Sequence, residues 1–221
     1  MSEINNIDDL FLFLNKFSQK KTKLLFRGHK SSEYKLIPSI GRYNTNRKKE
    51  FTPNDEIKTL KLFKQKSYPY LDKNVSKLEL LALAQHYGLP TRLLDWTWNP
   101  LVALYFSVKD DFNQDSAIFV WKKNFSGQLN PEFDPFKIKE IKLYIPLHFT
   151  KRIVAQSGIF SIQPNPNCEI VDNNISKIII KKEMRLEIKK SLEKFGINQS
   201  TIFPDLDGVG EYVKWLTTNV H

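Results

Sequence analysis

The sequence predicts an α+β fold, a single domain whose N-terminal helices pack on a mainly antiparallel sheet. Helical spacing of apolar residues dominates the first half, whereas the second half holds short apolar runs between segments rich in Asn, Pro and Asp. Strict alternation of strand and helix is absent, which disfavours a doubly wound parallel sheet. With 221 residues, 41% of them hydrophobic, the chain supplies apolar surface for a full core. We therefore expect one domain over residues 1–221, with its motifs in about residues 20–216.

The first half predicts four helices and one strand. Polar N-cap residues precede three of the helices, because Ser and Asn side chains accept hydrogen bonds from the first free backbone amides. Pro at the first helical position, as at Pro100, is also typical of a helix start. The expected elements are a helix over Ile7–Phe17 capped by Asn5 or Asn6, a strand over Lys23–Gly28, and helices over Asp55–Lys66, over Val75–Tyr87 with Ser76 as cap, and over Leu101–Val108 with Asn99 as cap.

The second half predicts strands followed by two helices. Turn-forming residues separate the strands, and Gly196 ends the first of these helices, as glycine commonly does. The expected elements are strands over Ser116–Lys122, Ile141–Ile145, Gly158–Gln163 and Ile175–Lys181, a surface loop over Asn124–Pro135, a helix over Glu183–Phe195, and a last helix that begins within Phe203–Gly208 and continues through Leu216.

Composition limits the classes of protein that this chain can be. The net charge of +10 favours polyanionic partners, so nucleic acid is a candidate partner. Cys168 is the only cysteine and lacks neighbours at metal-ligand spacing, so we expect no disulfide and no metal site. No apolar run approaches the roughly 20 residues that cross a bilayer, and the polar start does not resemble a signal peptide. We therefore expect a cytoplasmic protein without a membrane partner.

Residues Gln85–Pro100 are the strongest candidate for a site. This segment places His86, Arg92, Asp95 and aromatic rings in a turn between two helices, where side chains of these types are held rigidly. The turn precedes a helix N-terminus, which favours anionic ligands. No P-loop or G-x-G-x-x-G pattern accompanies it.

Each residue of this segment also has a structural interpretation. Arg92 and Asp95, three residues apart, can form an ion pair if they share a helical turn. Arg27 can instead pair with Asp95 inside the core. We expect Trp96 and Trp98 to face opposite sides, one in the core and the other beside a cleft or a nucleic acid base.

Four segments together resemble the FRG domain family. The resemblance covers most of the chain, and its long central motif is the most specific part. The segments are Phe26-Arg27-Gly28, the stretch from Ala84 to Pro100, Ala155-Gln156-Ser157-Gly158-Ile159-Phe160, and Phe203-Pro204-Asp205-Leu206-Asp207-Gly208.

A second resemblance concerns Leu24–Gly28, which is similar to the first core strand of ADP-ribosyltransferase folds. The resemblance implies an ADP-ribosyltransferase-like fold in which Arg27 and Gly28 lie against the diphosphate of NAD, with NAD as substrate. It further implies that His86 and Tyr87 orient the nicotinamide ribose. Arg92 is a further candidate for NAD binding. The group facing the developing oxocarbenium ion is Gln156, Glu183 or Glu211, and the candidate catalytic residues are His86, Gln156 and Glu211.

Two classes of function follow from these observations. The first is an NAD-dependent ADP-ribosyltransferase or glycohydrolase, a toxin or phage-defence effector that modifies nucleic acid. The second is a non-catalytic nucleic-acid-binding module, or a nuclease, with a basic groove along the aromatic-rich segment. The enzyme hypothesis predicts that Arg27, His86 and Gln156 meet in one pocket, and the binding hypothesis predicts an open groove beside Trp96 or Trp98.

Overall fold

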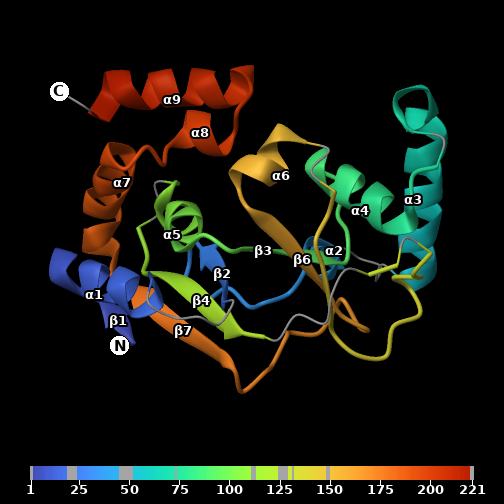
Figure 1. Ribbon diagram of the computed structural model, residues 1–221, viewed down its shortest axis with the longest axis horizontal. Helices are drawn as coiled ribbons and strands as arrows, with labels where there is room; N and C mark the ends of the chain where they lie inside the picture. Colours follow the sequence, from blue (N-terminus) through green and yellow to red (C-terminus); the bar gives the residue numbers. More distant parts are fainter. Residues whose placement is uncertain are drawn as a thin grey trace.

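One open sheet organises the part of the chain that the structure describes, shown in Figure 1. The computed structural model describes residues 2–18, 24–44, 52–72, 74–110, 113–123, 129–130, 132–147 and 150–219. The strands follow the order β1-β7-β4-β2-β3-β6-β5, and every neighbouring pair is antiparallel except β1 with β7. Their bounds are β1 (Glu3–Ile4), β2 (Leu24–His29), β3 (Leu93–Thr97), β4 (Ser116–Lys122), β5 (Lys142–Tyr144), β6 (Gly158–Ile162) and β7 (Ile175–Ile180).

Helices cover this sheet in two groups. On one face, α1 and α5 contribute buried side chains to the same cluster as β2, β4 and β7, with α7 beside them. Further along the sheet, α3 and α4 pack against β3, β5 and β6. The bounds are α1 (Ile7–Ser18), α2 (Ser39–Asn44), α3 (Pro53–Ser67), α4 (Lys77–His86), α5 (Pro100–Val108), α6 (Lys151–Ala155), α7 (Arg185–Lys194), α8 (Gln199–Ile202) and α9 (Leu206–Asn219), with 3-10 turns at Tyr68–Tyr70 and Lys182–Met184.

The α+β class with a mainly antiparallel sheet is confirmed, and the expected helix caps form. Ser76 and Glu79 make a capping box at α4, and the Asn99 side chain accepts a hydrogen bond from the Leu101 amide at 2.9 Å. Gly196 adopts a positive φ of 76° just after α7, as a glycine that ends a helix does. Lys23 and residues 124–128 and 131 of the expected loop lie outside the described residues.

One expectation is wrong: Gln85–Pro100 is not a turn between two helices. The chain leaves α4 through Gly88, at φ 84°, and then forms β3, which pairs with β6 before α5 begins. The charged residues in this stretch hid its strand character, since Asp is depleted in strands. Asp95 therefore lies on a strand of the sheet rather than in a loop, while His86 ends α4.

The sheet is nearly divided between β2 and β3. These strands share a single paired position, Phe26 with Thr97, whereas β2 pairs with β4 along its whole length. Backbone groups of β3 that face β2 therefore need other hydrogen-bond partners. This division is the feature that positions the candidate site.

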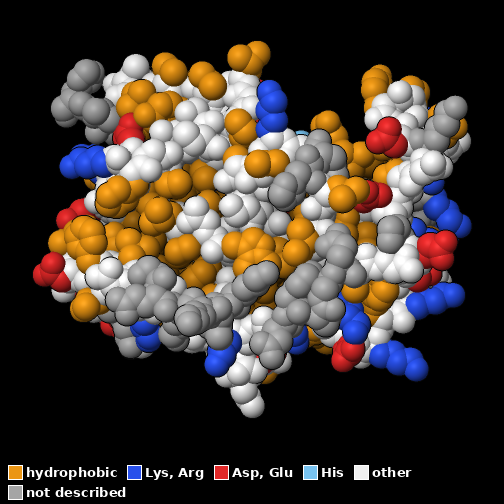
Figure 2. Space-filling view, viewed as in Figure 1, with side chains coloured by type: hydrophobic (Ala, Val, Ile, Leu, Met, Phe, Trp, Pro, Cys, Tyr) orange, Lys and Arg blue, Asp and Glu red, His pale blue; other side chains and the backbone are white. Residues whose placement is uncertain are grey.

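At the C-terminal end, α9 lies across α8 at the edge of the molecule (Figure 1). Figure 2 shows hydrophobic side chains exposed in this region, and Leu206, Val209 and Val213 are exposed on α9. None of the described helices has the length and apolar character required to cross a bilayer.

Gly28, where β2 packs against α5, and Gly210, on an open face of α9, should respond oppositely to substitution by alanine. A Cβ at Gly28 would lie 1.9 Å from the Ala103 carbonyl oxygen of α5, whereas a Cβ at Gly210 within α9 would meet nothing within 4 Å. We expect Gly28→Ala to lower the free energy of unfolding by about 2 kcal/mol or more, because α5 must shift. Gly210→Ala should raise it by about 0.5–1 kcal/mol, because alanine favours the helix.

Urea denaturation of both variants tests this pair. An unchanged stability of the Gly28 variant would show that α5 does not approach β2 as closely as described.

Candidate functional site

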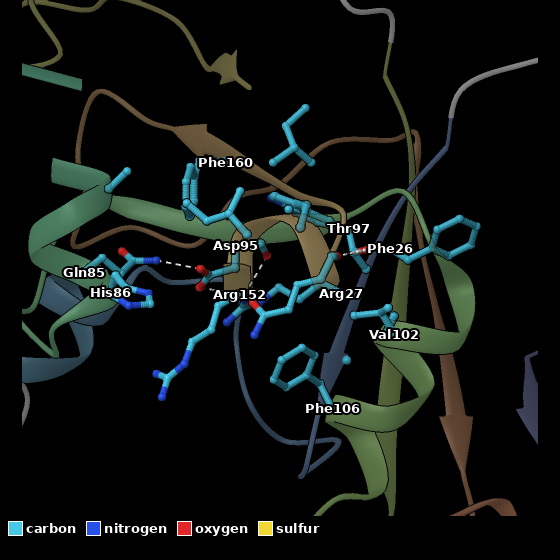
Figure 3. A pocket seen from close by; sticks show the side chains of 18 of the residues that line it. Phe26, Arg27, Gln85, His86, Asp95, Thr97, Val102, Phe106, Arg152 and Phe160 are labelled. Carbon is cyan, nitrogen blue, oxygen red and sulfur yellow. Dashed lines mark hydrogen bonds and ion pairs between the residues drawn. The ribbon is translucent and has the colours of Figure 1, made fainter. Parts of the chain in front are cut away.

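A cavity of about 300 Å³ lies beside the single paired position of β2 and β3 (Figure 3). Its walls come from β2, α4, β3, α5, α6 and β6, and Phe203 of the α8–α9 turn completes them. Segments far apart in the sequence thus meet at one hollow. Such concave sites with a few convergent polar groups are where small ligands bind.

Arg27 connects the two strands at the cavity. Its Nη1 donates to the Asp95 backbone carbonyl at 2.6 Å and lies 3.4 Å from the Asp95 carboxylate, while its Nε donates to His29 Nε2 at 2.8 Å. Burial lowers the pKa of Arg27, and Asp95 opposes this. Only 14% of the Arg27 side chain is exposed. The pairing of Arg27 with Asp95, one of the two interpretations of Arg27, is therefore present, and the same guanidinium also lines the cavity.

Asp95 presents its carboxylate to the cavity. Although it belongs to β3, its side chain is 60% exposed, and its Oδ1 accepts a hydrogen bond from Gln85 Nε2 at 2.7 Å. Gln85 in turn accepts a hydrogen bond from the Thr91 hydroxyl. The carboxylate is thus oriented by an amide and a guanidinium (Figure 3), and the sequence hypothesis had not placed it among the catalytic candidates.

His86 ends α4 and lines the same cavity. Burial lowers its pKa, the charge of Arg152 lowers it further, and Asp205 opposes both effects. The imidazole is therefore neutral at neutral pH, so that it can accept a proton. Tyr87 packs edge-on against the imidazole with ring centroids 4.9 Å apart, but its side chain is 70% exposed and does not line the cavity.

Arg152 supplies a second guanidinium, held by the α8–α9 turn. Its Nε and Nη2 lie 2.8 and 2.6 Å from Asp205 Oδ2, and its guanidinium carbon lies 5.3 Å from the centroid of the Phe203 ring. Asp205 Oδ1 accepts a hydrogen bond from the Gly208 amide at 2.9 Å, which caps α9. The expectation that Phe203–Gly208 opens a helix is confirmed, but sequence reasoning missed that this turn positions Arg152.

Gln156 lies at the end of α6 and also lines the cavity. Its side-chain Nε2 donates to the Ile202 backbone carbonyl at 3.3 Å, and the Gln156 backbone carbonyl accepts a hydrogen bond from the Thr97 hydroxyl at 2.7 Å. Ser157 follows with a positive φ of 46°, a conformation that costs free energy for a residue other than glycine. Arg27, His86 and Gln156 therefore share one cavity, as the enzyme hypothesis requires.

Three other candidates lie elsewhere. Arg92 is 1% exposed, and its Nε and Nη2 bind Glu56 Oε2 at 3.0 and 2.7 Å. The expected Arg92–Asp95 pair is wrong, because Arg92 directly precedes β3 and the two residues do not share a helical turn. Glu183 is exposed in a 3-10 turn, and Glu211 is exposed on α9 beside Lys214. Neither Glu183 nor Glu211 lines the cavity.

The expectation that the two tryptophans face opposite sides is also wrong, although Trp96 does line the cavity, as one of the two was expected to do. Trp96 is 2% exposed and donates from Nε1 to Ser161 Oγ at 2.9 Å, and Trp98 packs against the same hydrophobic cluster. Residues two apart on an extended chain point to one face, which explains why both rings contribute to the core. Within the described ranges, no three His, Cys, Asp or Glu side chains gather as metal ligands would.

Comparison with known families matches the FRG domain to residues 22–116. The chain carries an FRG domain. The matched segment ends at the first residue of β4, so it includes Arg27, His86 and Asp95, whereas Arg152 and Gln156 follow it. The matched segment thus supplies β2, α4, β3 and α5 to the cavity wall, and later parts of the chain supply α6, β6 and Phe203. Neither the curated proteins nor the solved structures give a significant match.

His29, behind Arg27 in the FRG domain, should make stability depend on pH. Burial and the charge of Arg27 lower the pKa of His29 from 6.5 to about 3, although its bond to the Tyr34 carbonyl raises it. The unfolded chain therefore binds this proton more readily, so stability falls as pH drops below 6.5 and continues to fall toward pH 3. Between about pH 7 and about pH 5 we expect a loss of roughly 2 kcal/mol in the free energy of unfolding.

Urea titrations at both pH values measure this loss. The matched variant His29→Gln, which does not titrate, should show a smaller dependence on pH by about that amount. Equal dependence in the two proteins would mean that His29 takes up a proton in the folded state.

Proposed function

We propose that the cavity binds a nucleotide, NAD in particular, and that the protein acts at the nicotinamide ribose in the manner of an ADP-ribosyltransferase or NAD glycohydrolase. The observation that carries this proposal is the meeting of Arg27, His86, Asp95, Arg152 and Gln156 in one hollow with aromatic walls. Each group that this chemistry needs is represented once or more, and these five residues come from β2, α4, β3 and α6 with its C-cap (Figure 3).

The two guanidinium groups support recognition of a diphosphate. Arginine presents several N–H donors in a planar fork that matches phosphate oxygens. Arg27 is held in the wall, and the Arg152 side chain is 30% exposed at the same cavity. One ligand with two neighbouring phosphates can therefore contact both cations.

Aromatic side chains support recognition of a planar base. Phe26, Phe106 and Phe203 line the cavity, and the Phe106 and Phe203 rings lie edge to face with centroids 6.0 Å apart. A nicotinamide ring placed against such faces is removed from water and gains dispersion contacts. His86 lies on the other side of the hollow, where it can bind ribose hydroxyls (Figure 3).

Asp95 is the group that we assign to the reacting ribose. When the bond between C1′ and the nicotinamide nitrogen breaks, its electron pair leaves with nicotinamide and positive charge grows on the ribose. A carboxylate nearby stabilises that charge. Of the earlier alternatives Gln156, Glu183 and Glu211, only Gln156 lines the cavity, and it carries no charge. We therefore assign to Asp95 the role for which these three residues were the candidates.

An acceptor then forms the new bond to C1′ and releases a proton, for which the neutral His86 is the candidate base. Water as acceptor gives ADP-ribose, and a nucleic acid group gives an ADP-ribosylated product. The net charge of +10 favours nucleic acid, the acceptor expected of a toxin or phage-defence effector. A purely binding role through Trp96 has less support, because that ring is buried and hydrogen-bonded.

Release of nicotinamide tests the proposal. The purified protein is incubated with NAD labelled in the adenine moiety, with RNA, DNA, protein or water alone as acceptor, and both free nicotinamide and labelled acceptor are measured. Nicotinamide release that Arg27→Ala and His86→Ala abolish supports the proposal. No release with any acceptor, together with no NAD binding by calorimetry, contradicts it.

A matched pair of carboxylate substitutions locates the reacting group. We expect Asp95→Asn to lower the rate of nicotinamide release by about 100-fold or more, because the amide no longer stabilises positive charge on the ribose. Glu211→Gln, an exposed position on α9 outside the cavity, should leave the rate within about twofold. Thermal melts of both variants serve as the folding control. Equal rates of nicotinamide release in the two variants would show that Asp95 does not take part in the reaction.

A further inference from the structure

His29 contacts the cavity residue Arg27 from within the core. The two residues are two apart on β2, so their side chains lie on the same face. His29 is 5% exposed and does not line the cavity itself. Its ring packs edge-on against Phe119 and Tyr34, with centroids 5.0 and 6.3 Å away. Packing against these two rings thus holds the imidazole in addition to its hydrogen bonds.

The hydrogen bonds of His29 fix which ring nitrogen carries its proton. Arg27 Nε always carries a hydrogen, so at 2.8 Å it donates, and His29 Nε2 must be the acceptor. The proton then resides on Nδ1, which lies 3.1 Å from the Tyr34 carbonyl oxygen and donates to it. His29 is therefore a neutral imidazole that links a loop carbonyl to the guanidinium.

Two edges of the Arg27 guanidinium are occupied in this arrangement. Nε donates to His29, and Nη1 donates to the Asp95 carbonyl at 2.6 Å. Within the described residues, Nη2 has no hydrogen-bond partner. Because a guanidinium is planar, fixing two of its nitrogens fixes the direction of the third. The remaining donor edge belongs to a side chain that lines the cavity.

We propose that His29 is a positioning residue, which aims the free edge of Arg27 at a phosphate group of the ligand. This rests on the proposed binding of a nucleotide in the same cavity. Without His29, Arg27 would keep its bond to the Asp95 carbonyl but could rotate about it, and ordering the side chain would then oppose binding. The positive charges of Arg42 and Lys177 act on His29 together with that of Arg27, which further favours its neutral form.

A double-mutant cycle tests the proposal, with NAD and nicotinamide riboside as calorimetric probes. We expect His29→Leu to weaken NAD binding by about tenfold, and to leave binding of nicotinamide riboside, which lacks phosphate, within about twofold. His29→Gln should restore most of the affinity, because its amide oxygen can accept from Arg27 Nε. In an Arg27→Ala background, His29→Leu should have no further effect. If His29→Leu lowers the affinity for NAD equally with Arg27 present and with Arg27 replaced by alanine, the proposal is overturned.

A second measurement keeps the test independent of the nucleotide. In nitrogen-15 NMR spectra, Arg27 Nε–H should exchange slowly with water in the wild type and in His29→Gln, and quickly in His29→Leu. If the wild type binds no NAD, the proposed function fails, and this exchange pattern still decides whether His29 orients Arg27. Fast exchange of Arg27 Nε–H in the wild type would refute positioning whatever the ligand.

Discussion

The hydrogen bond from Arg27 to the Asp95 carbonyl holds the two parts of the sheet in relation to one another. β2 and β3 pair at one position only, so the ladder cannot do this alone. A charged donor at 2.6 Å supplies a partner for a β3 carbonyl that faces β2. The cavity lies where a side chain, rather than a second run of backbone pairs, connects the two strands. Separation of the strands and the presence of a cation in the hollow are therefore consequences of one arrangement.

The residues around this bond form a continuous chain of hydrogen bonds. It runs from Thr91 through Gln85 to the Asp95 carboxylate, and from Arg27 through His29 to the Tyr34 carbonyl. Since each member is oriented by the next, the polar groups are in place before a ligand arrives, which lowers the entropy lost on binding. Asp95 is the acidic member of this chain, and its side chain is exposed. The polar side chains of the cavity are therefore held by residues that lie near them in space, and not by a turn over Gln85–Pro100 as the sequence had suggested.

The sequence predicted the elements better than the site. The helix starts at Ser76 and Asn99 could be predicted because capping depends on residues within one turn. The short strand β1 and the helix α6 carry too few residues for a periodic signal, and β3 was hidden by its charged residues. His86 was found through the residue types of its segment, Arg27 and Gln156 were found through a resemblance, and the structure places the three together.

Two ion pairs that join distant parts of the chain could not be predicted from the sequence. The pairing of Arg92 with Glu56 joins residues 36 positions apart, and that of Arg152 with Asp205 joins residues 53 apart. Local spacing carries no information about such distant partners, so the nearer Arg92–Asp95 pair was expected instead. Asp95 was recognised as charged but not as the carboxylate at the cavity, because its exposure depends on where β2 and β3 separate.

The two guanidinium groups differ in how freely they can adjust to a ligand. Arg27 bonds to a backbone carbonyl within the sheet and to a buried imidazole, so moving it would disturb the junction of β2 and β3. Arg152 bonds to a single carboxylate oxygen of Asp205, whereas the other oxygen caps α9. Arg152 can therefore turn toward a phosphate without loss of the helix cap, and its stacking on Phe203 limits the directions available. A ligand that contacts both would meet one fixed and one adaptable cation. The position of the ligand group at Arg152 can therefore vary, whereas the position of the group at Arg27 can vary little.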